Sequence, residues 1–202
     1  MKKLMLFTAG IFLMKFMVSA AEPYKAGDVA SDFSLKNVKG ETVSLSGYEM
    51  AKGFILVFTC NTCPVAKQYE QRIMDLHREF SRKGYPVVAI NSNDKNVSRG
   101  DSFDEMKKLA ESKGYEFSYL YDESQEVAKR YGATNTPHVY VLSKKDGKLI
   151  VEYIGAIDNN ADDASKANKK YVSDAVNALL KGEQVSLKST KAVGCGIKWK
   201  KA

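Results

Sequence analysis

Two cysteines, Cys60 and Cys63, stand three positions apart in the segment Cys-Asn-Thr-Cys. Two thiols at this spacing are about one helical turn apart and within reach of a disulfide bond. A thiolate can attack a disulfide of another molecule, and a second thiol can then resolve the mixed disulfide. The pair therefore predicts thiol–disulfide exchange, with Cys60 as the attacking thiol and Cys63 as the resolving thiol.

The elements on either side of the pair position these thiols. Residues 53–59 form a continuous apolar run rich in β-branched and aromatic side chains, which predicts a strand buried on both faces. After the pair, apolar residues recur at spacings of three and four as far as Phe80, which predicts an amphipathic helix. We expect Cys60 at the helix N-terminus, where free N–H groups and the helix dipole stabilise a thiolate. Pro64 fits the first turn, where its missing N–H is not needed.

Two other interpretations of the pair remain open. Cys-x-x-Cys is also half of a structural zinc site, although no second Cys or His pair follows at zinc-finger spacing. Alternatively, both cysteines are buried and inert, although a strand-to-helix junction is the expected setting of a redox motif. We therefore expect no metal and no organic cofactor, since the electrons would arrive through a partner's thiols.

The rest of the chain alternates strand and helix patterns. Asp146-Gly147 favours a tight hairpin turn, and Asp122 is a candidate cap for a helix that ends before Gly132. This order predicts an α/β domain with a central mixed sheet flanked by helices. We expect a strand pair within residues 30–45, strands over 86–91, 115–121, 138–143 and 149–154, and helices over 103–113, 122–131 and 167–180.

The N-terminus has the pattern of a secretory signal peptide. Residues 1–3 are a short positive start, residues 4–14 are apolar, and Val18-Ser19-Ala20 supplies the small residues that a signal peptidase recognises. The apolar run is shorter than the roughly 20 residues that an ordinary transmembrane helix needs. We expect a signal peptide over residues 1–20, with an uncleaved anchor as the alternative, and a periplasmic or secreted protein with no membrane span after cleavage.

The composition excludes several classes of protein. The chain has 202 residues, of which 44% are hydrophobic and 27% charged, as in a soluble globular domain. Three cysteines are too few for a disulfide scaffold. The net charge of +7 falls to about +4 when Lys2, Lys3 and Lys15 leave with the signal peptide. The remaining lysines lie on helix faces and in the tail without a nucleic-acid-binding motif, so we expect no nucleic-acid partner.

Several segments together resemble the thioredoxin-like fold, and more narrowly its redoxin branch of peroxiredoxin-like and extracytoplasmic thiol–disulfide proteins. They are Phe-Thr-Cys-Asn-Thr-Cys-Pro at 58–64, Val-Val-Ala-Ile-Asn-Ser-Asn at 87–93, the insert 101–123, Thr136-Pro137 and the closing segment 193–200. The resemblance covers nearly the whole mature chain. It implies one domain over residues 21–202, a three-layer sandwich with an N-terminal strand extension, a helical insert and a C-terminal tail over 183–202.

The resemblance also implies a substrate-binding loop and sets limits on the mechanism. Pro137 should be cis and face the cysteine pair, with the backbone of Thr136 pairing with an extended substrate segment. Peroxiredoxins carry a threonine three residues before the reactive cysteine, whereas Val57 precedes Cys60 at that distance and Cys60 itself precedes Cys63. The buried acid of thioredoxin would fall near Phe54, which cannot transfer protons.

Two further residues have open roles. Cys195, in a Gly-Cys-Gly tail, is either an auxiliary thiol that exchanges with the pair or a partner, or a packed free cysteine. His138 follows Pro137, and two thiolates with an imidazole would suit copper, although a plain strand histidine is the simpler interpretation. The leading prediction is an extracytoplasmic thiol–disulfide oxidoreductase acting on protein substrates with a redox partner protein. The alternatives are a thiol-dependent peroxidase and a copper-binding or copper-delivery protein using Cys60, Cys63 and His138.

Overall fold

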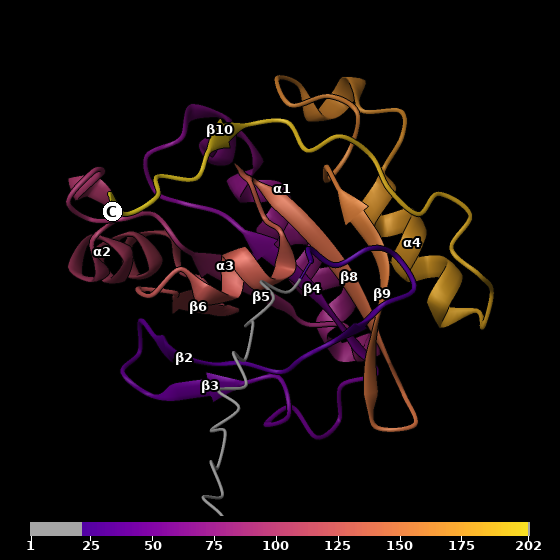
Figure 1. Cartoon of the computed structure of the whole chain (residues 1–202). Coiled ribbons are helices and arrows are strands. Elements are labelled where there is room, and N and C mark those ends of the chain that lie inside the picture. The colour runs from indigo at the N-terminus through magenta and orange to yellow at the C-terminus, as the bar shows by residue number, and fades with distance from the viewer. Residues whose placement is uncertain (1–21, 202) are drawn as a thin grey trace, which may run out of the picture.

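The computed structural model describes residues 22–201, so the expected signal peptide at 1–20 lies outside the described residues (Figure 1). The helices are α1 (Pro64–Phe80), α2 (Phe103–Lys113), α3 (Glu126–Tyr131) and α4 (Tyr171–Leu180), with short 3₁₀ segments at Ser81–Lys83, Arg99–Asp101 and Ala164–Lys166. The strands are β1 (Val29–Ala30), β2 (Ser34–Asn37), β3 (Thr42–Ser44), β4 (Gly53–Phe58), β5 (Val87–Asn91), β6 (Ser118–Tyr121), β7 (Asn135–Thr136), β8 (His138–Lys145), β9 (Lys148–Gly155) and β10 (Cys195–Gly196).

A mixed sheet of eight strands runs through the molecule in the order β1-β9-β8-β4-β5-β6-β2-β3. Strands β4, β5 and β6 are parallel, and β8 joins β4 on its other side as an antiparallel neighbour, with Val57 opposite both Ala89 and Val139. Strands β7 and β10 form a separate two-stranded sheet. The expected parallel centre with an antiparallel hairpin at one side is thereby confirmed.

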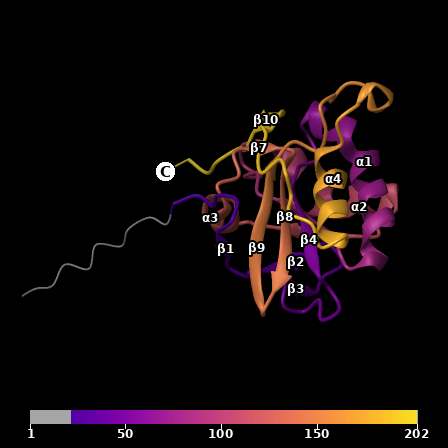
Figure 2. The same cartoon turned by 90° about the vertical axis from the view of Figure 1, so that its right-hand side faces the viewer.

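Helices cover both faces of the sheet, which gives three layers (Figure 2). Every residue of β4 is buried, because alternate side chains enter separate apolar cores on the two faces. Ile55 and Val57 pack on the side of α1, α2 and α4, whereas Phe54 and Phe58 pack on the side of α3 and the N-terminal segment. The sequence-based expectation of a buried central strand is confirmed.

Two helix starts differ from the predictions. Helix α4 begins at Tyr171 instead of Ala167, because Asn159 pairs with Asn168 and accepts the N–H of Lys169, which holds that segment extended. Helix α3 begins at Glu126, and Gln125 is its N-cap residue. Asp122 nevertheless caps this helix from a distance, since its carboxylate accepts hydrogen bonds from the N–H groups of Val127 and Ala128.

The hairpin turn at Asp146-Gly147 has the expected positive φ at both residues.

A small strand was not anticipated from the sequence. β1 pairs antiparallel with β9, with Val29 opposite Ile150, and so extends the main sheet by one strand. The predicted strand pair within residues 30–45 is present as β2 and β3, and β2 in turn pairs with β6. Among residues 22–201, no helix combines the length and apolar character that crossing a membrane requires.

Candidate functional site

The two cysteines lie where β4 ends and α1 begins, at one end of the sheet. Helix α1 starts at Pro64, and Cys63 is its N-cap residue with an extended backbone. The expectation that Cys60 stands at the helix N-terminus is therefore wrong. A proline disfavours helical backbone in the residue before it, so Cys63 marks the boundary and Cys60 lies in the preceding loop. Both side chains are buried.

The surroundings of the two thiols shift their pKa values in opposite directions. Burial raises the pKa of Cys60, and the nearby carboxylate of Asp101 adds to this, although Thr136 offers a hydrogen bond. Burial alone would also raise the pKa of Cys63. Hydrogen bonds from the Cys195 side chain and from the N–H groups of Ala66 and Cys195 outweigh that effect and hold the Cys63 pKa below its ordinary value. The site thus favours the thiolate at Cys63.

The loop between α3 and β8 faces the cysteine pair. The peptide bond between Thr136 and Pro137 is cis, as the resemblance implied. Cys60 Sγ and Thr136 Oγ1 share a hydrogen bond of 3.2 Å, and the Cys63 thiol donates to the Thr136 carbonyl at 3.2 Å. One residue of this loop therefore contacts both sulfur atoms. All four residues named as catalytic or substrate-binding from the sequence lie together.

Asp101 is a site residue that the sequence analysis did not identify. Its side chain is fully buried beside the cysteine loop, where Oδ1 accepts the N–H of Asn61 at 2.6 Å and Oδ2 accepts the Thr62 hydroxyl at 2.7 Å. Burial alone would raise the pKa of Asp101, but hydrogen bonds from Ser98, Asn93 and Thr62 hold it below its ordinary value. The buried carboxylate therefore stays charged and fixes both residues between the cysteines.

A buried polar network extends from Asp101 toward β5 and β6. Asn61 Oδ1 accepts the Tyr119 hydroxyl at 2.8 Å, and the Asn91 amide contacts both Tyr119 and Asp101. Burial raises the pKa of Tyr119 well above its ordinary value, so this phenol remains a neutral donor. The Asn-Thr pair inside the motif is thus held by Asp101 and by Tyr119 of β6, and Asn91 of β5 contacts both of these groups. The sequence feature nearest to this network was the polar run Asn-Ser-Asn at 91–93, which begins at the last residue of β5.

Cys195 lies against the same site. Strand β10 pairs antiparallel with β7, which places Cys195 directly opposite Thr136. The Cys195 N–H points to Cys63 Sγ at 3.4 Å, and the Thr136 hydroxyl donates to the Cys195 carbonyl at 3.4 Å. Cys195 is only partly buried and packs against a small cluster formed by Cys60, Cys63 and Ala66. All three cysteines of the chain therefore meet at one place.

His138 does not join this group. Its Nδ1 accepts the N–H of Thr134 at 3.3 Å, and its ring lies 5.0 Å from that of Tyr140 in the core on the other face of the sheet. Burial lowers the pKa of His138 to about 4. Within the described part of the chain, no three His, Cys, Asp or Glu residues are arranged to hold a metal ion. The three-residue copper arrangement considered from the sequence is not assembled here.

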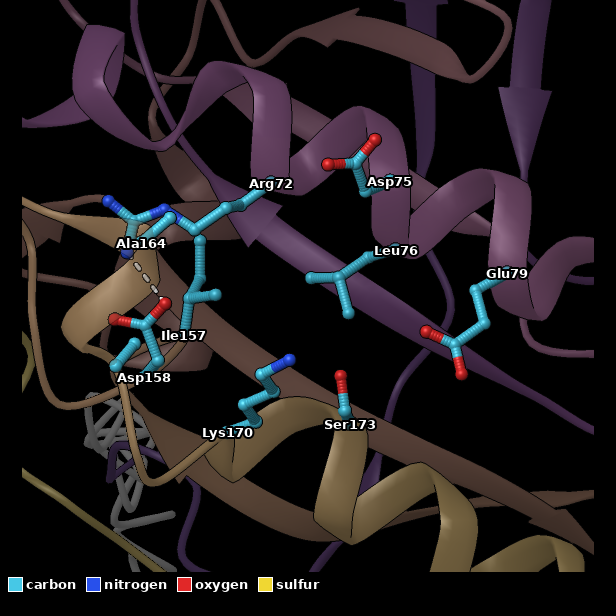
Figure 3. A pocket seen from close by; sticks show the side chains of 10 residues that line it. Arg72, Asp75, Leu76, Glu79, Ile157, Asp158, Ala164, Lys170 and Ser173 are labelled. Atoms are coloured by element: carbon cyan, nitrogen blue, oxygen red, sulfur yellow. Dashed lines mark hydrogen bonds and ion pairs between the residues drawn. The ribbon is translucent and has the colours of Figure 1, made fainter.

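A separate hollow lies between α1 and α4, away from the sulfur atoms (Figure 3). Arg72 reaches from α1 to Asp158, with which it forms an ion pair of 2.6 Å, and it also donates to the Asn160 carbonyl. Both side chains of the pair are largely buried. This contact ties the loop after β9 to α1, the helix that begins at Pro64 directly after the cysteine pair.

The AhpC/TSA family matches residues 26–153, which is more than half of the chain and includes both cysteines of the pair. The chain belongs to this family. Thiol-disulfide oxidoreductase ResA of Halalkalibacterium halodurans is 23% identical over 133 residues, covering 66% of this chain and 70% of that protein. Peroxiredoxin Bcp of Escherichia coli is 23% identical over 150 residues, covering 72% and 90%. The prediction of an oxidoreductase is confirmed at this level of enzyme class.

Solved structures agree with the fold. An uncharacterized conserved protein from Geobacillus kaustophilus superposes with a TM-score of 0.81 and 37% identity, over 88% of this chain and 93% of that one. The exposed lipoprotein thioredoxin Etrx1 of Streptococcus pneumoniae, with a TM-score of 0.54 and 23% identity, shares the fold. The predicted thioredoxin-like α/β architecture and the membership of the redoxin branch are confirmed.

Proposed function

We propose that this protein is an extracytoplasmic thiol–disulfide oxidoreductase that exchanges disulfides with protein substrates through Cys60 and Cys63. The proposal rests chiefly on one observation: Thr136 contacts both sulfur atoms of a Cys-x-x-Cys pair at the start of a long helix. Relatives named thiol-disulfide oxidoreductase support the activity. The signal-peptide pattern of residues 1–20 supports the location outside the cytoplasm.

The surroundings of the thiols favour Cys63 as the attacking group, which reverses the order expected from the sequence. The Cys63 thiolate attacks one sulfur of a substrate disulfide, forming a mixed disulfide and releasing the other substrate sulfur as a thiolate that takes a proton. Cys60 then loses its proton and attacks Cys63 Sγ. The Cys60–Cys63 disulfide forms, and the second substrate sulfur leaves as a thiol.

Thr136 is proposed to bind the substrate through its backbone. An extended peptide gains main-chain hydrogen bonds when it lies along a free strand edge, and specificity then comes from its side chains. The Thr136 carbonyl lies 3.2 Å from Cys63 Sγ, so a peptide paired with this residue would bring its own cysteine to the attacking sulfur. The resulting enzyme needs a redox partner protein that restores the thiols or the disulfide.

Substitution of each cysteine tests the proposal and the order of attack. Insulin disulfide reduction with a thiol donor is the assay, and Cys195→Ser is the common background so that only the pair can react. We expect Cys63→Ser to abolish exchange, whereas Cys60→Ser accumulates a mixed disulfide that is visible by non-reducing electrophoresis. Full activity of both variants would refute the proposal, and trapping by Cys63→Ser alone would restore the order expected from the sequence.

A thiol-dependent peroxidase is the principal rival, because some relatives are named peroxiredoxin. The position three residues before Cys63 is filled by Cys60, and the one three before Cys60 by Val57, which is fully buried in the sheet. Neither cysteine thus has the threonine that orients the peroxide in peroxiredoxins. Peroxide consumption faster than insulin reduction, with the same thiol donor, would favour the rival.

A further inference from the structure

The C-terminal tail crosses the end of the molecule that carries the cysteines (Figure 1). It runs from α4 past the end of β9, where Ser189 bridges Ile154, and then along Thr134–Thr136 as β10. Farther on, the Lys198 N–H donates to Asn93 Oδ1 at 2.8 Å, and the Lys198 carbonyl accepts the N–H of Asp94 at 2.8 Å. The tail is therefore docked along its length by main-chain hydrogen bonds.

The tail occupies the strand edge that the proposed substrate would need. Cys195 pairs with Thr136, and the Ile197 N–H donates to the Thr134 carbonyl at 3.0 Å, which is the hydrogen-bonding pattern of an added strand. The residue that lies opposite Thr136 is itself a cysteine, with its N–H 3.4 Å from Cys63 Sγ. A peptide substrate would have to bring its cysteine to this same place.

Gly194 lets the tail approach this closely. Its φ is +155°, and a Cβ built there would collide with the Thr136 carbonyl oxygen and lie 2.7 Å from the Thr136 carbonyl carbon. Gly196, two residues on, has only one atom near its own virtual Cβ, the Thr134 carbonyl oxygen at 3.9 Å. Any side chain at 194 would thus push the tail away, whereas a methyl group at 196 fits.

We propose that the tail is an internal substrate strand, and that Cys195 takes the disulfide over from the Cys60–Cys63 pair to form a Cys63–Cys195 bond. This inference rests on the proposed function, because it requires the pair to be redox-active. The internal disulfide locks the docked tail onto the strand edge at Thr136. The oxidised enzyme therefore excludes a peptide substrate until a thiol reduces this disulfide. Cys195 is the least buried of the three cysteines and so is the sulfur that an incoming reductant reaches.

The exchange step is balanced within the chain. Cys195 loses its proton to solvent and attacks Cys63 Sγ in the Cys60–Cys63 disulfide. The Cys63–Cys195 bond forms, the Cys60–Cys63 bond breaks, and Cys60 leaves as a thiolate that takes up a proton. The number of disulfides is unchanged, and no outside oxidant is consumed. A partner's dithiol then reduces the new bond by attack on Cys195.

The charges in the reduced site agree with this order. The hydrogen bond to Cys63 is the main cause that raises the pKa of Cys195 to about 11, whereas the pKa of Cys63 is lowered, so Cys63 loses its proton more readily than Cys195. Once Cys63 Sγ is bonded to Cys60, that sulfur is uncharged and this cause disappears. Cys195 is therefore a weaker nucleophile in the reduced protein than when the pair is oxidised.

Peptide mapping of the oxidised full-length protein tests the inference. Reduced protein is oxidised with diamide, remaining thiols are alkylated, and trypsin releases residues 53–67 with both cysteines of the pair and residues 192–198 with Cys195. We expect these two peptides linked, with one thiol alkylated on the first. The link should persist in Cys60→Ser and be lost in Cys63→Ser. Alkylated Cys195 in both the wild type and Cys60→Ser would overturn the inference, as would an equal link through Cys60 in Cys63→Ser.

A matched pair of glycine variants separates a docked strand from accidental proximity. Gly194→Ala should slow formation of the link about 10- to 100-fold, because a displacement of about 1 Å from the reacting geometry costs that much. Gly196→Ala should form the link at the wild-type rate. Equal rates in both variants would overturn the placement of Cys195 by the tail strand.

Insulin reduction by Cys195→Ser distinguishes failure of the inference from failure of the proposed function. Activity in this variant together with an unlinked tail in the wild type would refute the internal substrate while leaving the function of the pair intact. A link in the wild type with no insulin reduction by either protein would refute exchange with protein substrates, and the internal disulfide would stand.

Discussion

Replacement of Asp101 with Asn removes one charge and one acceptor from the buried centre of the cysteine loop. Every partner of this carboxylate is a donor: Oδ1 accepts from the Asn61 N–H and the Asn91 amide, and Oδ2 accepts from two hydroxyls and the Asn93 amide. The NH₂ group of an asparagine cannot accept hydrogen bonds. The hydroxyls can rotate to become acceptors, but an amide of Asn91 or Asn93 would then face another donor.

The loss of stability in Asp101→Asn follows from the number of donors that surround this carboxylate. A buried donor without a partner costs about 1–3 kcal/mol, and the remaining hydrogen bonds lose the extra strength that a charged acceptor gives. The carboxylate's own desolvation penalty is relieved at the same time, so we expect a net loss of about 2–4 kcal/mol in the free energy of unfolding. For a domain of this size, that corresponds to a Tm lower by roughly 5–15 °C.

Chemical denaturation at several pH values is the assay for Asp101→Asn. The folded-state pKa of Asp101 lies below its ordinary value near 4, so the carboxylate stabilises the fold above about pH 4. The wild type loses this stability as the pH falls through the folded-state pKa, whereas the stability of Asp101→Asn should not change with pH for this reason. Asp75→Asn, which removes an exposed ion pair with Arg78, is the control and should change stability by less than about 0.5 kcal/mol.

Asp101→Asn also has a readout that a purely structural role would not affect. The negative charge of Asp101 is one of the causes that raise the Cys60 pKa, so its removal should lower that pKa. The ultraviolet absorbance of the Cys60 thiolate, followed against pH in the double variant Cys63→Ser/Cys195→Ser, measures the change. An Asn variant with wild-type stability at neutral pH and an unchanged Cys60 pKa would refute the role given to this carboxylate.

Three further substitutions test other parts of the scaffold. Burial lowers the His138 pKa to about 4, so the wild type should gain up to about 3 kcal/mol of stability as the pH rises from 4 to 6.5. Urea titrations at both ends of that range measure the gain, and His138→Gln should not show it. Arg72→Met leaves Asp158 buried without its partner and should cost about 3–5 kcal/mol, part of which the added change Asp158→Leu restores. Gly53→Ala pushes a methyl group into the Leu142 carbonyl and should lower the Tm; an unchanged melting curve would contradict that packing.

Local patterns were sufficient to predict the elements that carry the site. The uninterrupted apolar run of β4 predicted burial on both faces, since a strand between two helical layers has no solvent side. The Asp146-Gly147 pair predicted its hairpin because both residues need a positive φ. The late start of α4 could not be predicted in this way, because the side-chain contact between Asn159 and Asn168 overrides local helix propensity.

The correct start of α1 at the motif could have been predicted from the sequence. Pro64 indicates a first helical position, but it also disfavours helical backbone at Cys63, and this second consequence favours Cys63 as the N-cap residue. The helix end and its free N–H groups therefore act on the second cysteine. Asp101 had no comparable signal, since it lies about 40 residues from the motif and only the fold brings it beneath Asn61.

The N-cap position of Cys63 and the buried carboxylate of Asp101 together influence which of the three cysteines carries a negative charge. The helix start and the N–H of Cys195 favour the charge at Cys63, and the fixed carboxylate of Asp101 disfavours it at Cys60. The hydrogen bond to Cys63 disfavours it at Cys195 as well. Of the three thiols, Cys63 therefore loses its proton most readily, and its two neighbours keep theirs more firmly. Oxidation of Cys63 removes that charge, and either neighbour can then attack the same sulfur, so the position of the tail decides which disulfide the enzyme holds.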